Sequence, residues 1–362
     1  MFGENANYMQ HIDVFTDLGC RSFKDLSPVL TSLSVAIPSI ISPDSLALLP
    51  THTLQRITLH EVRSRELNVL LCGIDSGHEH VVYGALRSLK ICLRVGPTNA
   101  SDNEDSRLLQ TSPRTLKFPQ LEYLYMKGIR QPVPQMLLSA LASRGQCMKC
   151  LYIDRTIHGS EIFNIQHMQR LRRLHVTTPY IDNAQALLKW AFPVALPELQ
   201  TIALESQVNV AGRLPRVLLL PSLRRVELCV FIDLVQVWQL VRQLPRLAFL
   251  WVMISDAEDQ SAEVRLADAE GMVLRDIEGL GSPLHTLHIW SRTALCTESG
   301  EPSQIGVEFV TLLASLTSLV SFVCDTSAAG VRNMLCLLLR NHRIASRAAH
   351  LGALHIKEYG SL

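Results

Sequence analysis

The 362-residue sequence predicts an α/β solenoid, in which short parallel strands alternate with helices or turns along a repeating chain. A six-residue apolar phrase, L-x-x-L-x-L, recurs twelve times between residues 30 and 356. Several segments between these copies have helical periodicity, and proline often precedes the phrase. With 48% hydrophobic and 19% charged residues, the chain can also bury a large core. We therefore expect one repetitive architecture.

The repeated phrase defines the expected strands. Any of Leu, Ile, Val, Met, Phe or Cys stands at its apolar places, and clear copies read LRSLKI, LEYLYM, LRRLHV and LHTLHI. Successive copies start 23 to 37 residues apart, and the shorter intervals are typical of leucine-rich repeats. Because alternate residues of a strand point in opposite directions, the last two apolar places face a core while their neighbours face outward. The twelve copies start at Leu30, Leu54, Leu86, Leu121, Met148, Leu171, Leu199, Leu223, Leu247, Leu284, Leu319 and Leu351.

Helices are expected between the strands, because the apolar residues of these segments recur with helical spacing. Proline stands two residues before the first Leu of a copy at Pro119, Pro197, Pro221 and Pro245, where it ends the preceding helix. The expected helices span residues 133–143, 181–192, 234–244, 263–280, 307–316 and 327–340.

Residues 26–362 are expected to form a single repeat domain of about twelve irregular repeats, with insertions at 96–117 and 256–282. The first insertion is polar and reads as a surface loop, whereas the second starts acidic and becomes helical. A solenoid must cover its first strand, so residues 1–25 are expected to cap that edge as a helix, or else the natural product is longer. The apolar residues available for such a helix are Ile12, Val14, Phe15, Leu18 and Phe23.

The phrase P-x-L-x-x-L-x-L, as at residues 197–204 and 221–228, resembles the leucine-rich-repeat region of fungal F-box proteins. The resemblance covers roughly residues 26–362 and implies a horseshoe with parallel strands on its concave face and irregular helices outside. The resemblance also implies that the protein is the substrate receptor of a cullin-RING ubiquitin ligase, and that its repeats select the target protein. Two features depart from the family. The ninth repeat position never carries Asn or Cys, and no F-box precedes residue 26, so a ligase adaptor would bind only through an F-box encoded upstream.

The net charge and the lack of targeting signals limit the kinds of partner and the compartment that we expect. A net charge of +1 gives the chain no basic excess for nucleic acid or an anionic membrane, and the local cluster of Arg170, Arg172, Arg173 and His175 reads as a solvated strand edge. Neither a secretory signal nor an apolar run long enough to span a bilayer is present. The nine cysteines follow no framework spacing and are expected to be reduced. We therefore expect a cytoplasmic and/or nuclear protein that binds neither nucleic acid nor membrane.

Catalytic motifs are missing from the sequence, including a G-x-S-x-G elbow, a P-loop and a G-x-G-x-x-G turn after a strand. Cys147 and Cys150 form a C-x-x-C, but no second pair follows at metal-ligand spacing. The His-Glu-His run at residues 78–80 lies in a turn-like segment and is expected to be a solvated loop. We expect no catalytic residue, metal or cofactor and no enzymatic activity; a hydrolase built from loops around residues 78–80 is the less favoured alternative.

The residues that alternate with the buried leucines supply the candidate binding surface. In a horseshoe, the third, fifth and seventh repeat positions line the concave face, and six of the chain's 21 aromatic residues (7 Tyr, 4 Trp and 10 Phe) stand there. Since Tyr, Trp and Arg dominate interface energetics, we expect a protein partner on this face. The alternatives are a free-standing scaffold or inhibitor without a ubiquitin link, and a packing role for Phe249 and Trp251 beneath the second insertion. The candidate partner-binding residues are Tyr123, Tyr125, Tyr152, Arg173, His175, Arg225, Phe249, Trp251, His288 and Trp290.

Overall fold

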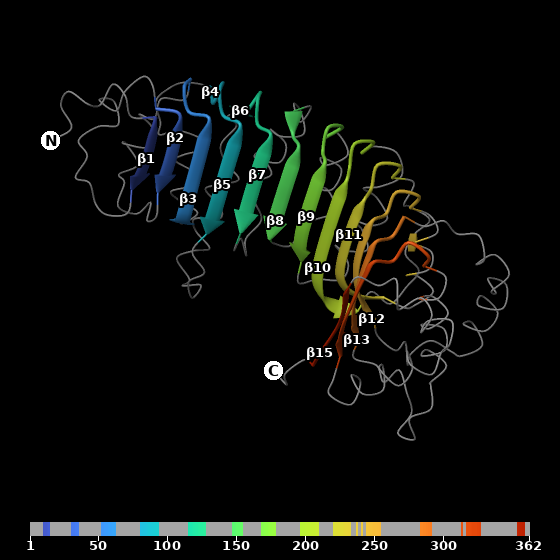
Figure 1. The fold of residues 1–362 in the computed structure, drawn as a ribbon. Coiled ribbons are helices and arrows are strands. Elements are labelled where there is room, and N and C mark those ends of the chain that lie inside the picture. The colour runs from blue at the N-terminus through green and yellow to red at the C-terminus, as the bar shows by residue number, and fades with distance from the viewer. Residues whose placement is uncertain are drawn as a thin grey trace. The chain divides into compact units, whose positions relative to one another are not determined.

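The chain divides into two compact units, Met1–Thr178 with Ala195–Glu198, and Pro179–Val194 with Leu199–Leu362. The computed structural model describes mainly the strands and the turns that precede them (Figure 1). The described residues are 10–14, 30–35, 52–62, 80–93, 115–127, 147–154, 168–178, 196–209, 220–232, 237, 240–241, 244–254, 283–291, 313, 316–326 and 353–358.

Within the described part of the first unit, seven strands form one sheet in chain order, and every neighbouring pair is parallel. Figure 1 shows these strands side by side in that order. They are β1 (His11–Val14), β2 (Ser32–Val35), β3 (Arg56–Val62), β5 (Ser88–Leu93), β7 (Tyr123–Lys127), β8 (Cys150–Asp154) and β9 (Arg173–Thr178). A separate parallel pair joins β4 (His80–Val82) to β6 (Thr115–Lys117).

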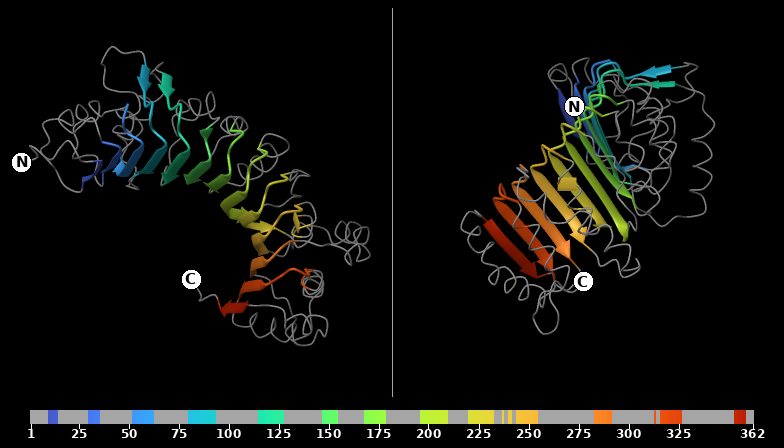
Figure 2. Two further views of the ribbon diagram at one scale, coloured as in Figure 1. Left: turned by 45° about the horizontal axis from the view of Figure 1, so that its top comes forward. Right: turned by 90° about the vertical axis from the view of Figure 1, so that its right-hand side faces the viewer.

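The second unit by itself has six described strands, which are also parallel and paired in chain order. The right-hand view of Figure 2 shows them face on. They are β10 (Thr201–Asn209), β11 (Arg225–Ile232), β12 (Phe249–Ile254), β13 (Thr286–Ser291), β14 (Ser321–Thr326) and β15 (Ala353–Glu358).

The predicted repeat sets the register of the strands. All twelve predicted strands form, and each begins at the third position of its L-x-x-L-x-L phrase. The three apolar places of the first eleven copies are all buried, so leucine stacks on leucine from strand to strand, as Leu124, Leu151 and Leu174 do. Such parallel stacking of short strands confirms the predicted α/β, leucine-rich-repeat-like solenoid.

Backbone hydrogen bonds fix the start of each strand. The second-position carbonyl of one repeat accepts two N–H groups from the next repeat, as Glu122 does from Lys149 at 2.8 Å and Cys150 at 2.9 Å. A buried residue three positions before the first Leu of the phrase also accepts a hydrogen bond through its carbonyl, from the N–H of that Leu. The Met168 carbonyl accepts from the Leu171 N–H in this way, at 2.9 Å. Both carbonyl lone pairs of these second positions are therefore used, and successive strands begin in line.

Each proline of the repeated phrase occupies the second place of this turn. Pro119 follows Phe118, whose carbonyl accepts the Leu121 N–H at 3.3 Å, which is the i to i+3 bond of a β-turn. Proline suits that place because its fixed φ matches the turn. In the third repeat the same place is held by Gly84, between Tyr83 and Leu86.

Replacing Gly84 by proline is expected to stabilise the protein. A Cβ built on Gly84 meets no atom within 4 Å, and proline restricts the unfolded chain, so Gly84→Pro should raise the free energy of unfolding by about 0.4–1 kcal/mol. Urea denaturation of the purified chain measures the change. Pro119→Gly is the matched reverse substitution and should lower stability by a similar amount. A destabilised Gly84→Pro variant would contradict the equivalence of the two turns.

Two parts of the predicted organisation need correction. Residues 11–14 of the predicted N-terminal helix form β1, which pairs in parallel with β2, because the first repeat's free strand edge is satisfied by another strand. The N–H groups of Thr31 and Ser32 both donate to the carbonyl of Gln10, at 3.0 and 2.9 Å. The other correction concerns the polar 96–117 insertion, whose last three residues form β6 instead of a loop.

The predicted helices are described in two places. Val237, Leu240 and Val241 are helical and buried, and the Leu244 N–H donates to the Leu240 carbonyl at 3.1 Å. Leu313, in the predicted helix at 307–316, is also helical and buried. The other four predicted helices and the 256–282 insertion lie outside the described residues. Among the residues that are described, no helix combines the length and apolarity needed to cross a bilayer.

Candidate functional site

The residues at the third, fifth and seventh positions of each repeat form what we call the open face of each unit. They point away from the buried leucines and are mostly half-buried or exposed. Because all strands start in register, residues at one position form a row across neighbouring strands. The ten predicted partner-binding residues all lie on these rows, six strands contributing them: β7, β8 and β9 in the first unit and β11, β12 and β13 in the second.

The fifth-position row of the first unit holds a continuous stack, the tyrosine column, made of Lys90, Tyr125, Tyr152 and His175. The ring centroids of Tyr125 and Tyr152 are 4.1 Å apart at an interplanar angle of 16°. Tyr152 stacks in turn on His175 at 4.2 Å and 28°. At the other end, the Lys90 ammonium lies 5.3 Å from the Tyr125 ring centroid, within cation–π range. The column crosses four neighbouring strands from β5 to β9.

Two further side chains of the open face, Thr177 and Tyr123, lie beside the column. Thr177 Oγ1 lies 3.3 Å from His175 Nε2, and Tyr123, on the adjacent row, is 47% exposed. Three of the column residues were predicted as binding residues, but Lys90 was not among them. The LRSLKI phrase places Lys90 at the fifth position of its repeat, which is the sequence signal that could have identified it.

Tyr152 is the middle ring of the column and is half-buried. Burial raises the pKa of its phenol to about 12, and Tyr125 and Asp154 add to the rise, whereas a hydrogen bond from the Thr177 side chain lowers it. The hydroxyl therefore stays protonated at neutral pH and can act as a hydrogen-bond donor.

Alkaline titration should detect this tyrosine. The phenol ionises near 10 in the unfolded chain and near 12 in the folded one, so the stability that it contributes is present below pH 10 and lost as the pH rises from 10 to 12. The ultraviolet absorbance difference between wild type and Tyr152→Phe should show the phenol ionising near pH 12. In parallel denaturation series, wild type should lose more stability than Tyr152→Phe over this interval. A transition near pH 10 would contradict the partial burial of the Tyr152 phenol.

The second unit carries a different group on its open face, the tryptophan cluster, which consists of Arg225, Glu227, Phe249, Trp251, His288 and Trp290. The Arg225 guanidinium lies 3.8 Å from the Phe249 ring centroid and also donates to Glu227. Trp251 stacks on His288 at 5.4 Å and 26°. The Trp251 Nε1 is buried and has no hydrogen-bond acceptor among the described residues. The Nε1 of Trp290 is buried as well.

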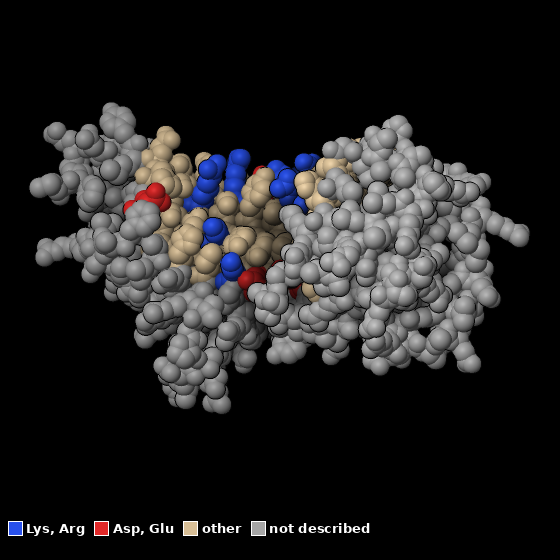
Figure 3. Space-filling model, turned by 60° about the horizontal axis from the view of Figure 1, so that its bottom comes forward, with Lys and Arg blue, Asp and Glu red and all other residues tan. Residues whose placement is uncertain are grey.

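The two open faces differ in charge. The described cations of the first unit's face are Arg56, Lys90, Lys127 and Arg173. Its described acids are Asp154 and Asp13, and Asp13 already pairs with His11 at 3.0 Å. Figure 3 shows Lys and Arg side chains gathered on the described surface, with fewer Asp and Glu side chains between them.

The face of the second unit is acidic around Cys229. Burial raises the pKa of the Cys229 thiol to about 12, and Glu205 and Glu227 raise it further. The described residues of the first unit thus offer the face better suited to negative charge.

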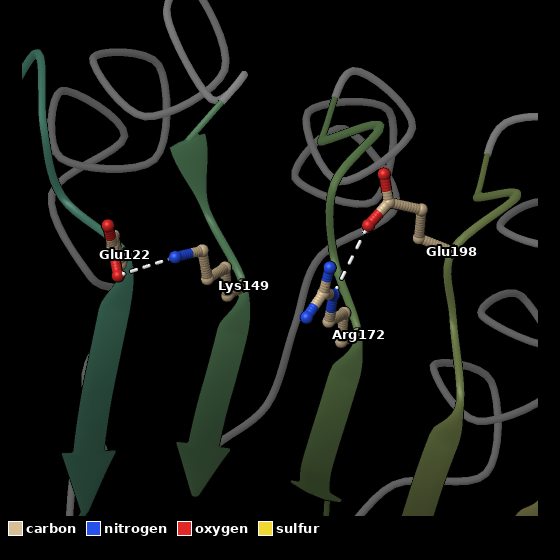
Figure 4. Close-up of polar contacts among 4 residues, drawn as sticks. All are labelled: Glu122, Lys149, Arg172 and Glu198. Atoms are coloured by element: carbon tan, nitrogen blue, oxygen red, sulfur yellow. Dashed lines mark hydrogen bonds and ion pairs between the residues drawn. The ribbon is translucent and has the colours of Figure 1, made fainter.

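Ion pairs lie beside the open face of the first unit, at the starts of its strands (Figure 4). Lys149 Nζ is 2.8 Å from Glu122 Oε2, and Arg172 Nε is 3.2 Å from Glu198 Oε2. Partly exposed pairs of this kind contribute about 0.2–1 kcal/mol each. The predicted basic cluster is therefore divided: Arg172 is paired at the edge, Arg170 lies exposed in the preceding turn, and Arg173 and His175 join the open face.

The cysteine pair shows no features of a metal or redox site. Cys147 and Cys150 are half-buried free thiols, and burial raises the pKa of Cys150 although the Arg173 guanidinium opposes the rise. A raised pKa disfavours the thiolate that metal binding and nucleophilic attack require. In the part of the chain that the structure describes, no three His, Cys, Asp or Glu side chains gather as metal ligands. Of the other candidate, residues 78–80, only His80 is described, as the first residue of β4.

The fold and site define a class of protein, a parallel-stranded repeat solenoid with aromatic and charged residues on its open faces. No protein-family model matches the chain, and no curated protein sequence is significantly similar to it.

Proposed function

We propose that this chain is a non-enzymatic protein-recognition module that binds a protein partner on the open face of its first unit. The tyrosine column is the observation that carries the proposal. Three stacked rings and a lysine hold each other in place across four strands, so little side-chain entropy remains to be lost on binding. Tyrosine is also among the residues most enriched at the energetic centres of interfaces.

The exposure of this surface supports the same function. Tyr123 is one of two large hydrophobic side chains that are exposed in the described residues, and it stands beside the column on β7. An exposed aromatic ring next to an ordered aromatic row provides both apolar area and hydroxyl groups for a partner. A rigid parallel sheet fixes their spacing, which a loop-built surface would not.

Substrate selection for a cullin-RING ubiquitin ligase is the finer form of this proposal. It rests on the resemblance of the repeat phrase to fungal F-box proteins, and in this form the repeats hold the protein that is to be modified. Adaptor binding would then depend on an F-box encoded upstream. The alternative within the same class is a repeat scaffold or inhibitor that binds its partner without any ligase.

Site-specific photo-crosslinking tests the recognition function. A benzophenone amino acid replaces Tyr123, and in the matched control it replaces Val320, which is 46% exposed but lies at a second repeat position off the open face. A protein that crosslinks from position 123 and not from 320, and that binds the purified wild-type chain, supports the proposal. Equal labelling from both positions, or none, would overturn it. Recovery of the ligase adaptor with the product of the full transcript separates the receptor from the free-standing scaffold.

A further inference from the structure

The partner's chemistry can be inferred from the charges around the tyrosine column. Lys90 and Lys127 both lie close enough to Cys92 to lower the pKa of its thiol, although burial raises that pKa more strongly. On the other side of the column, Arg173 acts in the same way on Cys150. Cations therefore flank the column at both ends. Among the described residues, neither Lys90, Lys127 nor Arg173 has an ion-pair partner.

The column offers a partner its ring edges. Tyr125 and Tyr152 stack face to face, Tyr152 stacks on His175, and Lys90 lies over Tyr125, so both faces of each tyrosine ring are already occupied. Aromatic rings are negative on the face and positive at the edge, and tyrosine adds a hydroxyl donor there. Carboxylates are therefore favoured above the column. A nucleobase is disfavoured, because single-stranded nucleic acid binds mainly by stacking on free ring faces.

The spacing suits a short extended peptide. β5, which carries Lys90, and β9, which carries Arg173, are three strand-to-strand steps apart, which is about 14 Å at the usual strand spacing of roughly 4.8 Å. An extended chain advances about 3.3 Å per residue, so about four residues cover this distance. Two acidic side chains about four residues apart could reach both cationic ends of the column.

From this arrangement we infer that the first unit's open face binds an extended, Asp/Glu-rich protein segment, with its carboxylates on Lys90, Lys127 and Arg173 and its backbone along the tyrosine column. The inference rests on the proposed recognition function and specifies its ligand. Charge complementarity favours an acidic ligand, since the face carries four described cations and only one acid, Asp154, that is not already paired.

Fluorescence anisotropy with two labelled peptides tests the inference on the full chain. One probe repeats Glu-Gly-Ser-Gly three times, and the other is the same peptide with Gln in place of Glu. The Glu probe should bind, and the Gln probe should bind at least about tenfold more weakly, given a loss of roughly two- to fivefold for each exposed charge contact. Raising the ionic strength from about 0.05 to about 0.5 M should weaken the binding of the Glu probe only, because the Debye length shortens and its charge contacts are screened.

Charge variants then locate the site. Lys90→Gln with Arg173→Gln should weaken Glu-probe binding by roughly four- to 25-fold, whereas Lys90→Arg should preserve it. Arg224→Gln with Arg246→Gln removes the same charge from exposed positions of the second unit and should change binding by less than about twofold.

Three outcomes would overturn the inference: no binding of the Glu probe, equal binding of the Gln probe, or tighter binding of an oligouridylate probe of equal length. Its failure is distinguishable from failure of the proposed function. If a protein crosslinks specifically from position 123 but its binding is not changed by the charge variants, the acidic ligand would be wrong and the protein-recognition function would still be supported.

Discussion

Phe322→Ala is expected to lower the free energy of unfolding by about 3–5 kcal/mol, the largest effect of any substitution considered. Phe322 is 1% exposed and is the largest fully buried side chain of the described core. It stands at the fourth position of its repeat, where its neighbours in register are Leu287 on β13 and Leu354 on β15. Truncation therefore removes the packing of a fully buried ring and leaves a cavity that a regular sheet cannot close.

Denaturant unfolding of the purified chain measures the loss, and Val320→Ala is the matched control. Val320 lies two residues away in the same segment but is 46% exposed, so its truncation should change stability by no more than about 0.5 kcal/mol. A loss below about 1 kcal/mol for Phe322→Ala would contradict the fully buried position of this ring in the core.

Hydrogen exchange on the same variant shows how far the damage spreads. In a repeat solenoid each strand contacts only its neighbours, so amides of β13, β14 and β15 should lose protection first. Those of β2 to β9, in the other compact unit, should keep theirs. Uniform loss of protection along the whole chain would show that the two units unfold as one.

The sequence was sufficient to predict the strands, for a physical reason. Each strand must bury alternate residues against its neighbours, so the pattern of Leu121, Leu124 and Met126 determines which residues face the core and where the strand begins. The same alternation predicted that Tyr125 and Tyr152 lie on the opposite face. Their adjacency in one row follows from the common register, but their stacking depends on side-chain rotamers, which the pattern does not encode.

Elements outside the repeat could not be predicted in this way. β4 and β6 are three residues each and lack the apolar phrase, and their pairing joins segments more than 30 residues apart. β1 contains only four residues, in a segment whose apolar spacing also fits a helix. What decides its structure is the unpaired edge of β2, a tertiary requirement that overrides local propensity.

Tyr152→Ala is expected to weaken binding of the partner by about 30-fold or more, corresponding to roughly 2 kcal/mol at an interface hot spot. Tyr152 is the middle ring of the column, so its removal separates Tyr125 from His175 and loosens both. Because the ring is half-buried and not part of the leucine core, the free energy of unfolding should fall by only about 1 kcal/mol. Calorimetric titration with the protein that crosslinks from position 123 measures the change in affinity.

Two further variants separate the ring from its hydroxyl. Tyr152→Phe keeps the stack and loses one hydrogen-bonding group, so affinity should fall by only about two- to tenfold. Tyr125→Ala with Tyr152→Ala should lose less affinity than the product of the single losses, because each substitution already disrupts the stack on which the other acts. If Tyr152→Phe weakened binding as much as Tyr152→Ala, the phenol oxygen would be the contact and the stacked column would serve only to hold it in place.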